Sequence, residues 1–267
     1  QGAETMVNCR EKDLETSGLF IHKNLFTSQN YKTVKGEKQK YKTYVLYKKS
    51  GEIEIDGKKK NSCPNKSDAC YKYCLDNAGR GSFNAVKLSR LIKTKRYYFD
   101  PARFKVDVIN EIHRKFTWWV KNKPDWRLAF RCDGTSDLGV GRAISHSVPD
   151  SVNLYDYTKN FNVVKKYIRG DYNKNYHLTF SYSGENKKQC IQALNMGVNV
   201  AVPFIHNIKA MRDLPTSWHP EQFWGYPVIS GENSDLRFLD PAPSIVALKP
   251  KGALMRDYSG FAIRGAW

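Results

Sequence analysis

The chain has 267 residues, and its 44 Lys and Arg against 26 Asp and Glu give it a formal net charge of +18. Hydrophobic residues make up 40 % of the sequence and aromatic residues 13 %, which excludes an intrinsically disordered chain. Apolar runs such as 198–205 are too short to span a membrane, and we expect no secretory signal because no N-terminal stretch joins a basic start to an apolar core.

The excess of positive charge predicts a polyanionic partner. A net charge this far from zero is costly by self-repulsion unless a polyanion relieves it, and phosphate contacts supply much of the affinity for nucleic acid. We therefore expect DNA, or another nucleic acid, as the partner. A membrane partner is not expected, because no basic amphipathic helix stands out. The alternative is a solvated basic surface without a partner.

The first part of the chain, residues 1–62, is interpreted as a basic N-terminal extension. Residues 1–5, ahead of Met6, are interpreted as a remnant of cloning. Residues 41–49 are typical of a strand, and 48–60 of a turn-rich hairpin punctuated by Gly51 and Gly57. Residues 63–267 are expected to form the main domain.

Two helices are predicted next, over 83–96 and from Pro101 onward. Pro101 suits the first turn of a helix. Phe104, Val108 and Ile112 recur at helical spacing after it, as do Phe116 and Trp119. This stripe is expected to pack in the core.

Short apolar runs then recur at intervals of one strand, loop and helix. Helices are expected over 161–169 and 186–195, with Gly197 ending the second. Strands that alternate with helices favour an α/β fold with a parallel sheet. We expect a full or partial (β/α) TIM-like barrel first and an open doubly wound sheet second. The predicted strands are 126–132, 152–157, 176–181, 199–204, 226–229 and 245–248.

Polar residues follow every one of these strands, where parallel α/β folds place their functional groups. Three carboxylates, Asp133, Asp137 and Asp235, are candidate catalytic residues, as nucleophile, general base or metal ligand. Asp137 and Asp235 have a structural alternative as helix caps, and Asp235 has a second one as the partner of Arg237 in an ion pair. The candidate substrate-binding residues are Tyr157, Lys159, Ser183, Glu185, Asn186, His206, Lys249 and Lys251.

Three of the six cysteines, Cys63, Cys70 and Cys74, lie within the segment 63–80 and predict a metal site. Thiolates suit zinc or an iron–sulfur cluster, and zinc is the first choice. The alternative is three redox-inert cysteines. Candidates for a fourth ligand are Cys9, His22, His113 and Cys132.

The cysteine segment, with Ala78-Gly79-Arg80-Gly81 after it, resembles a family of bacteriophage proteins known as gene product 88-like. The resemblance covers about residues 63–262 and implies a phage-type protein in the cytoplasm of an infected bacterial host. Further matching segments are 131–137, 155–159, 176–181, 197–202 and 235–241.

A looser, architectural resemblance links the chain to the barrel-shaped guanine transglycosylases, including the phage enzymes that place 7-deazaguanines in DNA. That resemblance implies a carboxylate nucleophile, a second carboxylate and a zinc ion held by three cysteines. The zinc cysteines of the tRNA enzymes lie late in their chains, whereas Cys63, Cys70 and Cys74 lie early.

From these patterns we expect a DNA-modifying enzyme that exchanges guanine for a 7-deazaguanine, with a free purine base as co-substrate. One alternative is an iron–sulfur enzyme with radical chemistry, although the usual radical cysteine spacing is absent. A second is a metal-dependent nuclease. A third is a non-enzymatic nucleic-acid-binding protein with a structural metal.

Overall fold

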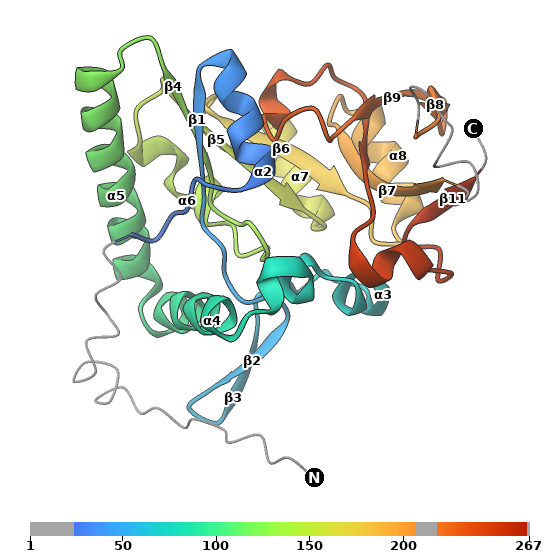
Figure 1. Ribbon diagram of the computed structural model, residues 1–267, viewed down its shortest axis with the longest axis horizontal. Coiled ribbons are helices and arrows are strands. Elements are labelled where there is room, and N and C mark those ends of the chain that lie inside the picture. The colour runs from blue at the N-terminus through green and yellow to red at the C-terminus, as the bar shows by residue number, and fades with distance from the viewer. Residues whose placement is uncertain (1–23, 207–217, 266–267) are drawn as a thin grey trace.

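The computed structural model describes residues 24–206 and 218–265, and one large sheet organises them (Figure 1). The nine-stranded sheet has the order β1-β4-β5-β6-β7-β10-β9-β8, and β11 pairs with the end of β7. Its strands are β1 (Tyr41–Val45), β4 (Arg127–Arg131), β5 (Val152–Thr158), β6 (Tyr176–Ser181), β7 (Val200–His206), β8 (Gln222–Phe223), β9 (Tyr226–Ser230), β10 (Ile245–Leu248) and β11 (Ile263–Gly265).

All neighbouring strands of this sheet are parallel except β8 and β9. The predicted α/β class with a parallel sheet is therefore confirmed. The described residues do not close the sheet into a barrel. β9 lies beyond β10 although it precedes β10 in the chain, and β8 then turns back antiparallel. The far edge is thus occupied by β8, and β1 remains the other edge.

Helices cover one face of the sheet, where the main core lies (Figure 1). The core joins Phe104, Val108 and Ile112 of α5 to strand residues such as Phe130 and Leu154. The helices on this face are α5 (Pro101–Asn122), α6 (Val140–Ile144), α7 (Phe161–Arg169) and α8 (Lys187–Asn195), and α4 (Asn84–Phe99) packs against α5.

Local signals explain where these helices begin and end. The Asp100 side chain caps α5 by accepting a hydrogen bond from the Arg103 N–H at 2.8 Å, and Pro101 occupies the first turn. Gly170 ends α7 in the left-handed conformation with φ 84°. None of the described helices is long and apolar enough to cross a membrane.

The opposite face of the sheet is covered by the segment after β9 rather than by a long helix. Leu236 and Phe238, in and beside the short 3-10 helix Arg237–Leu239, pack on Tyr41, Ala129 and Tyr155. α2 (Tyr31–Lys35) lies next to this segment, because Gly36 at its end meets the Leu236 side chain. We call this side the second face.

A separate hairpin, β2 (Glu52–Ile55) with β3 (Lys58–Asn61), projects from the sheet before the cysteine segment (Figure 1). Ile53 and Ile55 are buried, whereas the lysines of β3 are exposed. The hairpin predicted over 48–60 is confirmed with its strands over 52–61. β1, which lies within the segment 1–62, is an integral strand of the main sheet.

The predicted elements agree closely with the observed ones. The strands over 176–181 and 245–248 and the helix over 161–169 have the predicted bounds. The strand predicted over 41–49 ends at Val45, because the chain beyond it turns Lys48 into the interior. The strand predicted over 199–204 continues to His206, where β11 pairs with it.

A matched pair of substitutions tests the core. Val108 is 0 % exposed and Val106 is 48 % exposed on the same helix. Val108→Ala is expected to lower the free energy of unfolding by about 2 kcal/mol, because it deletes buried methyl groups and leaves a cavity. Val106→Ala is expected to stay within about 0.5 kcal/mol of the parent. Urea denaturation measures both, and equal losses would contradict this packing.

Candidate functional site at the carboxyl ends of the strands

The segment between β1 and α4, which carries the clustered cysteines, lies at the carboxyl end of the sheet. α3 (Asp68–Lys72) contains Cys70, and the Ser67 hydroxyl caps it by accepting a hydrogen bond from the Cys70 N–H at 3.1 Å. Ser67 also donates to the Ser183 carbonyl, 2.5 Å away in the loop after β6. The Ser62 carbonyl accepts from the Asp137 N–H at 2.8 Å. Loops after β4 and β6 therefore hold the cysteine segment in place.

Lys159, the residue directly after β5, lies among the thiols. Its ammonium group is hydrogen-bonded to Cys70 and attracted to Cys63 and Asp137. Burial alone would lower the pKa of Lys159, but these attractions outweigh it and raise that pKa. Burial raises the pKa of the Cys63 thiol to about 11, against a lowering effect of Lys159. Lys159 is thus held as a cation beside the thiols.

The predicted metal site is not assembled by these side chains as they stand. Among residues 24–206 and 218–265, no three His, Cys, Asp or Glu side chains are grouped so that they could hold a metal ion. Cys63, Cys70 and Cys74 are free of disulfides and partly buried. Three thiols in one short segment are nevertheless the donor type of zinc and iron–sulfur sites.

The structure describes two of the four predicted fourth ligands, His113 and Cys132. Cys9 and His22 lie outside the described residues. His113 is exposed on α5, where its Nε2 lies 3.1 Å from the Ser147 carbonyl oxygen. Cys132 is fully buried, and burial raises the pKa of its thiol well above the usual value.

Asp133, predicted as catalytic, is fully engaged in the interior. Its Oδ1 lies 3.0 Å from the Lys48 ammonium, and the two side chains are 1 % and 0 % exposed. Burial would raise the pKa of Asp133, but Lys48 and the Ser136 hydroxyl lower it to about 2. The N–H groups of Leu138 and Val140 donate to the same carboxylate at 3.2 and 2.9 Å. These partners make Asp133 the organiser of its loop.

Asp137, at the other end of the same loop, faces the cysteine segment. It accepts hydrogen bonds from the Thr158 hydroxyl at 2.9 Å and from the Lys159 N–H at 3.0 Å. The Arg142 guanidinium lies 3.6 Å away, and the Asp137 side chain is 12 % exposed. Asp137 is therefore the predicted carboxylate that lies with the cysteines and Lys159.

Asp156 was not among the predicted site residues, although it lies behind the same loop. Its Oδ1 accepts the Asp133 N–H at 2.7 Å, and its Oδ2 has no hydrogen-bond partner among the described residues. Burial, followed by repulsion from Asp133, raises the pKa of Asp156 to about 8. Gly141 leaves room for it, because a Cβ there would lie 2.3 Å from Oδ2. The sequence signal that could have identified Asp156 is its position as the single acid within the strand Val152–Thr158.

Asp235 and Tyr157 lie apart from this group, on the second face. The Tyr155 hydroxyl donates to Asp235 Oδ2 at 2.9 Å. The Arg131 guanidinium lies 3.8 Å from the same oxygen and 4.3 Å from the centre of the Tyr157 ring. Arg131 had not been predicted. Arg131 is the last residue of β4, and the sequence signal that could have identified it is a cation at the carboxyl end of a strand.

Arg237 and Asp240 complete this group. Arg237 Nη1 lies 3.1 Å from Asp240 Oδ2, and its side chain is 2 % exposed. Burial raises the pKa of Asp240 to about 6, although Arg237 opposes the shift. The predicted alternative for Asp235, an ion pair with Arg237, is replaced by the contact with Arg131.

The remaining predicted residues have several separate environments. Ser183 and Asn186 hold the loop after β6 together, since the Asn186 side chain accepts the Ser183 N–H at 2.8 Å. His206 is buried at the end of β7, and its Nδ1 lacks a hydrogen-bond partner among the described residues. Three residues are exposed in loops: Glu185, Lys249 and Lys251.

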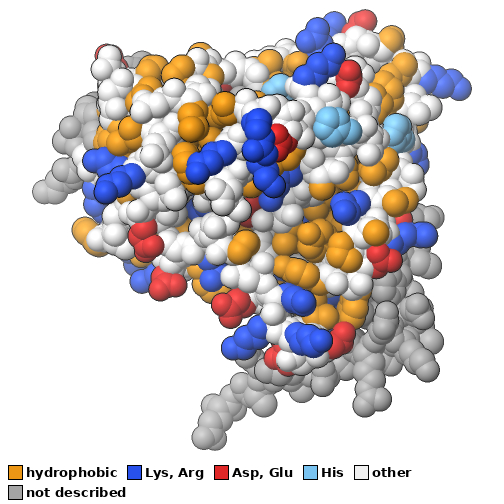
Figure 2. Space-filling view, turned by 180° about the vertical axis from the view of Figure 1, so that it is seen from behind, with side chains coloured by type: hydrophobic (Ala, Val, Ile, Leu, Met, Phe, Trp, Pro, Cys, Tyr) orange, Lys and Arg blue, Asp and Glu red, His pale blue; other side chains and the backbone are white. Residues whose placement is uncertain are grey.

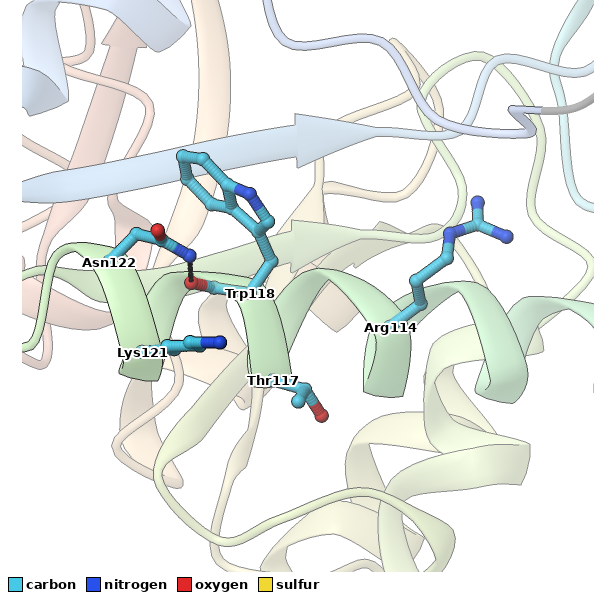
Figure 3. Close-up of a pocket in the computed structure, with 5 residues that line it drawn as sticks. All are labelled: Arg114, Thr117, Trp118, Lys121 and Asn122. Carbon is cyan, nitrogen blue, oxygen red and sulfur yellow. Dashed lines mark hydrogen bonds between the residues drawn. The ribbon is translucent and has the colours of Figure 1, made fainter.

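A surface hollow lies elsewhere, on the outer side of α5 (Figure 3). It combines the exposed Trp118 with the cations Arg114 and Lys121, and the Asn122 amide donates to the Trp118 carbonyl at 2.7 Å. α5 leads into the amino end of β4, so the hollow is remote in topology from the carboxyl ends. It does not belong to the candidate site.

The positive charge does not form a single patch on the side of the molecule seen in Figure 2. On the side seen in Figure 2, Lys and Arg side chains are scattered singly and in small groups between hydrophobic and acidic ones. Helix α4 is locally more basic, with five Lys and Arg residues and no acid in its sequence NAVKLSRLIKTKRYYF. On this side, charge alone therefore does not locate a binding site.

Comparison with known protein families identifies a match that covers most of the chain. The sequence profile of a family described as gene product 88 matches residues 24–265. No curated protein and no solved structure matches the chain.

The Asp133–Asp156 contact predicts a particular pH dependence of stability. The pKa of Asp156 is about 8 in the folded chain and about 3.9 when unfolded, so the folded state holds an extra proton between these values. This contribution is complete below about pH 4 and is lost as the pH rises through 8, by at most about 1.4 kcal/mol per pH unit.

Asp156→Asn removes the titration and keeps an oxygen acceptor for the Asp133 N–H. The variant is therefore expected to gain stability relative to the parent between pH 5 and pH 8, measured by urea denaturation at each pH. If the difference in stability between Asp156→Asn and the parent stayed constant from pH 5 to pH 8, the raised pKa of Asp156 would be contradicted.

Proposed function

The chain belongs to the gene product 88 family, and we propose that it is an iron–sulfur enzyme that modifies nucleic acid. The observation that carries the proposal is the place of the three thiols. Cys63, Cys70 and Cys74 lie in the segment after the β2–β3 hairpin, which the loops after β4 and β6 hold at the carboxyl end of the parallel sheet. Functional groups of parallel α/β folds lie at that end.

The donor set suits an iron–sulfur cluster. Cluster iron is bound by Cys thiolates, and three of them leave one iron of a four-iron cluster without a protein ligand. A cluster of this kind supplies one-electron and radical chemistry when bound. The thiols would have to turn toward one another, and Cys70 would give up its hydrogen bond to Lys159.

The residues around the thiols have their own proposed tasks. Lys159 provides a fixed cation that offsets the negative charge of thiolates. Asp137 fixes the end of β5 through Thr158 and the Lys159 N–H. The net charge of +18 supports a polyanionic substrate, and we propose DNA in the cytoplasm of a phage-infected host.

Base exchange with a 7-deazaguanine is our second proposal. Asp235 favours it, because this buried carboxylate is hydrogen-bonded to Tyr155 and lies beside Arg131. That reaction needs a second carboxylate at the same sugar. Asp133 is enclosed by Lys48 and three further donors, so Asp137 would have to serve. The presence of three cysteines in one segment favours the iron–sulfur proposal over this one, because thiols are the donors of such a cluster.

Anaerobic reconstitution with iron and sulfide tests the first proposal. The full chain is expected to bind iron and acid-labile sulfide and to show charge-transfer absorbance, because thiolates ligate the cluster. Substitution of Cys63, Cys70 or Cys74 by Ala should remove most of the iron. Cys190→Ala is the matched control, since Cys190 also lies near Lys159 but comes from α8.

A colourless protein that binds zinc through the same cysteines would overturn the iron–sulfur proposal. With the reconstituted protein, reductant and S-adenosylmethionine, a frequent partner of such clusters, nucleoside mass spectrometry of incubated DNA should detect a product of altered mass. Base exchange instead requires retention of labelled 7-deazaguanine in DNA without reductant. Asp235→Asn should abolish that retention, because the exchange depends on a carboxylate nucleophile.

A further inference from the structure

We propose that Arg131 and Arg237 bind an oxyanion, the phosphate or carboxylate group of a small ligand, on the second face of the sheet. The proposal concerns binding alone and stands whether or not the chain holds iron. Arg131 ends β4, and Arg237 begins the short 3-10 helix that covers this face.

The two guanidinium groups have donors without acceptors. A guanidinium offers five N–H donors in a planar array. Arg237 Nη2 donates to the Ser234 carbonyl, whereas its Nε and Nη1 have no hydrogen-bond partner among the described residues. Arg131 Nη2 donates to the Gly134 carbonyl at 3.3 Å, and its Nε also lacks a partner there. Buried donors left in this way are costly unless a ligand or water satisfies them.

The two cations converge on one place. Arg131 lies 4.3 Å from the centre of the Tyr157 ring and 3.8 Å from Asp235 Oδ2. Burial raises the pKa of Tyr157, and Arg237 and Arg131 both oppose that shift, so Arg237 also lies near this phenol. Tyr157, Asp240 and Asp235 in turn raise the pKa of Arg237 against the effect of its burial. Two guanidinium groups beside one phenol can share a single bound anion.

The neighbouring carboxylates do not saturate these donors. The separation of 3.8 Å between Arg131 and Asp235 is too long for a hydrogen bond. Asp240 Oδ2 lies 3.1 Å from Arg237 Nη1, yet neither atom makes a hydrogen bond within the described residues. Arginine favours phosphate and carboxylate because its planar donors can bond two oxygens at once. An oxyanion ligand would supply that geometry.

The site is open to solvent at one side. Arg237 is 2 % exposed, but the Arg131 side chain is 19 % exposed. Arg131 is the last residue of β4, so the approach lies toward the carboxyl end of the sheet.

Isothermal titration calorimetry of the full chain with inorganic phosphate, and separately with acetate, tests the proposal. At least one anion is expected to bind, and the preferred one distinguishes a phosphate ligand from a carboxylate ligand. Arg131→Gln and Arg237→Gln should each weaken binding at least about tenfold, the loss of about one charge-assisted hydrogen bond. Asp240→Asn should strengthen binding, because it removes a competing negative charge without removing a donor.

The matched control is Arg127→Gln, which removes an exposed guanidinium from the other end of β4 and should leave the affinity unchanged. If Arg237→Gln fails to fold, the other two variants still test the site, because Arg131→Gln should lower the anion affinity and Asp240→Asn should raise it. The proposal is overturned if neither anion binds the parent chain, if Arg131→Gln binds as tightly as the parent, or if Arg127→Gln weakens binding equally. None of these readouts depends on iron, so they are separable from the cluster test.

Discussion

The buried ion pair between Lys48 and Asp133 fixes the carboxyl end of the sheet. The two charges lie 3.0 Å apart with 0 % and 1 % of their side chains exposed. Lys48 follows β1 and Asp133 follows β4, so the pair joins these neighbouring strands beyond the last residues of their ladder. Removing one member of such a pair typically costs about 3–5 kcal/mol, because the other charge stays buried without compensation. The loops that follow both strands depend on this contact.

The ion pair also decides which acid reaches the cysteine segment. The Asp133 oxygens are occupied by Lys48, Ser136 and two backbone N–H groups. This leaves Asp137 to bond the end of β5 beside Lys159. Lys48 compensates the charge of Asp133 but not that of the neighbouring Asp156. Burial and the charge of Asp133 raise the pKa of Asp156 to about 8, so Asp156 keeps its proton at neutral pH.

The sequence predicted most of the elements because their signals are local. Apolar runs and turn residues gave the strands over 176–181 and 245–248 and the helix over 161–169. The open sheet depends on β10 pairing with the more distant β7, which places β9 beyond β10, and no local pattern encodes this strand order. At the site, Asp137 and Lys159 were found because they follow strands, and the cysteines were found because three of them cluster in one short segment. The structural role of Asp133 was hidden, because its partner Lys48 lies in a segment that resembled a solvated hairpin.

Strand β5 shows how the two proposed sites are related. Successive side chains of a strand point to opposite faces, so Asp156 joins the buried acids while Tyr157 joins Arg131 on the second face. Lys159, two residues further, lies among the thiols. One strand end thus contributes to the arginine group and to the cysteine segment.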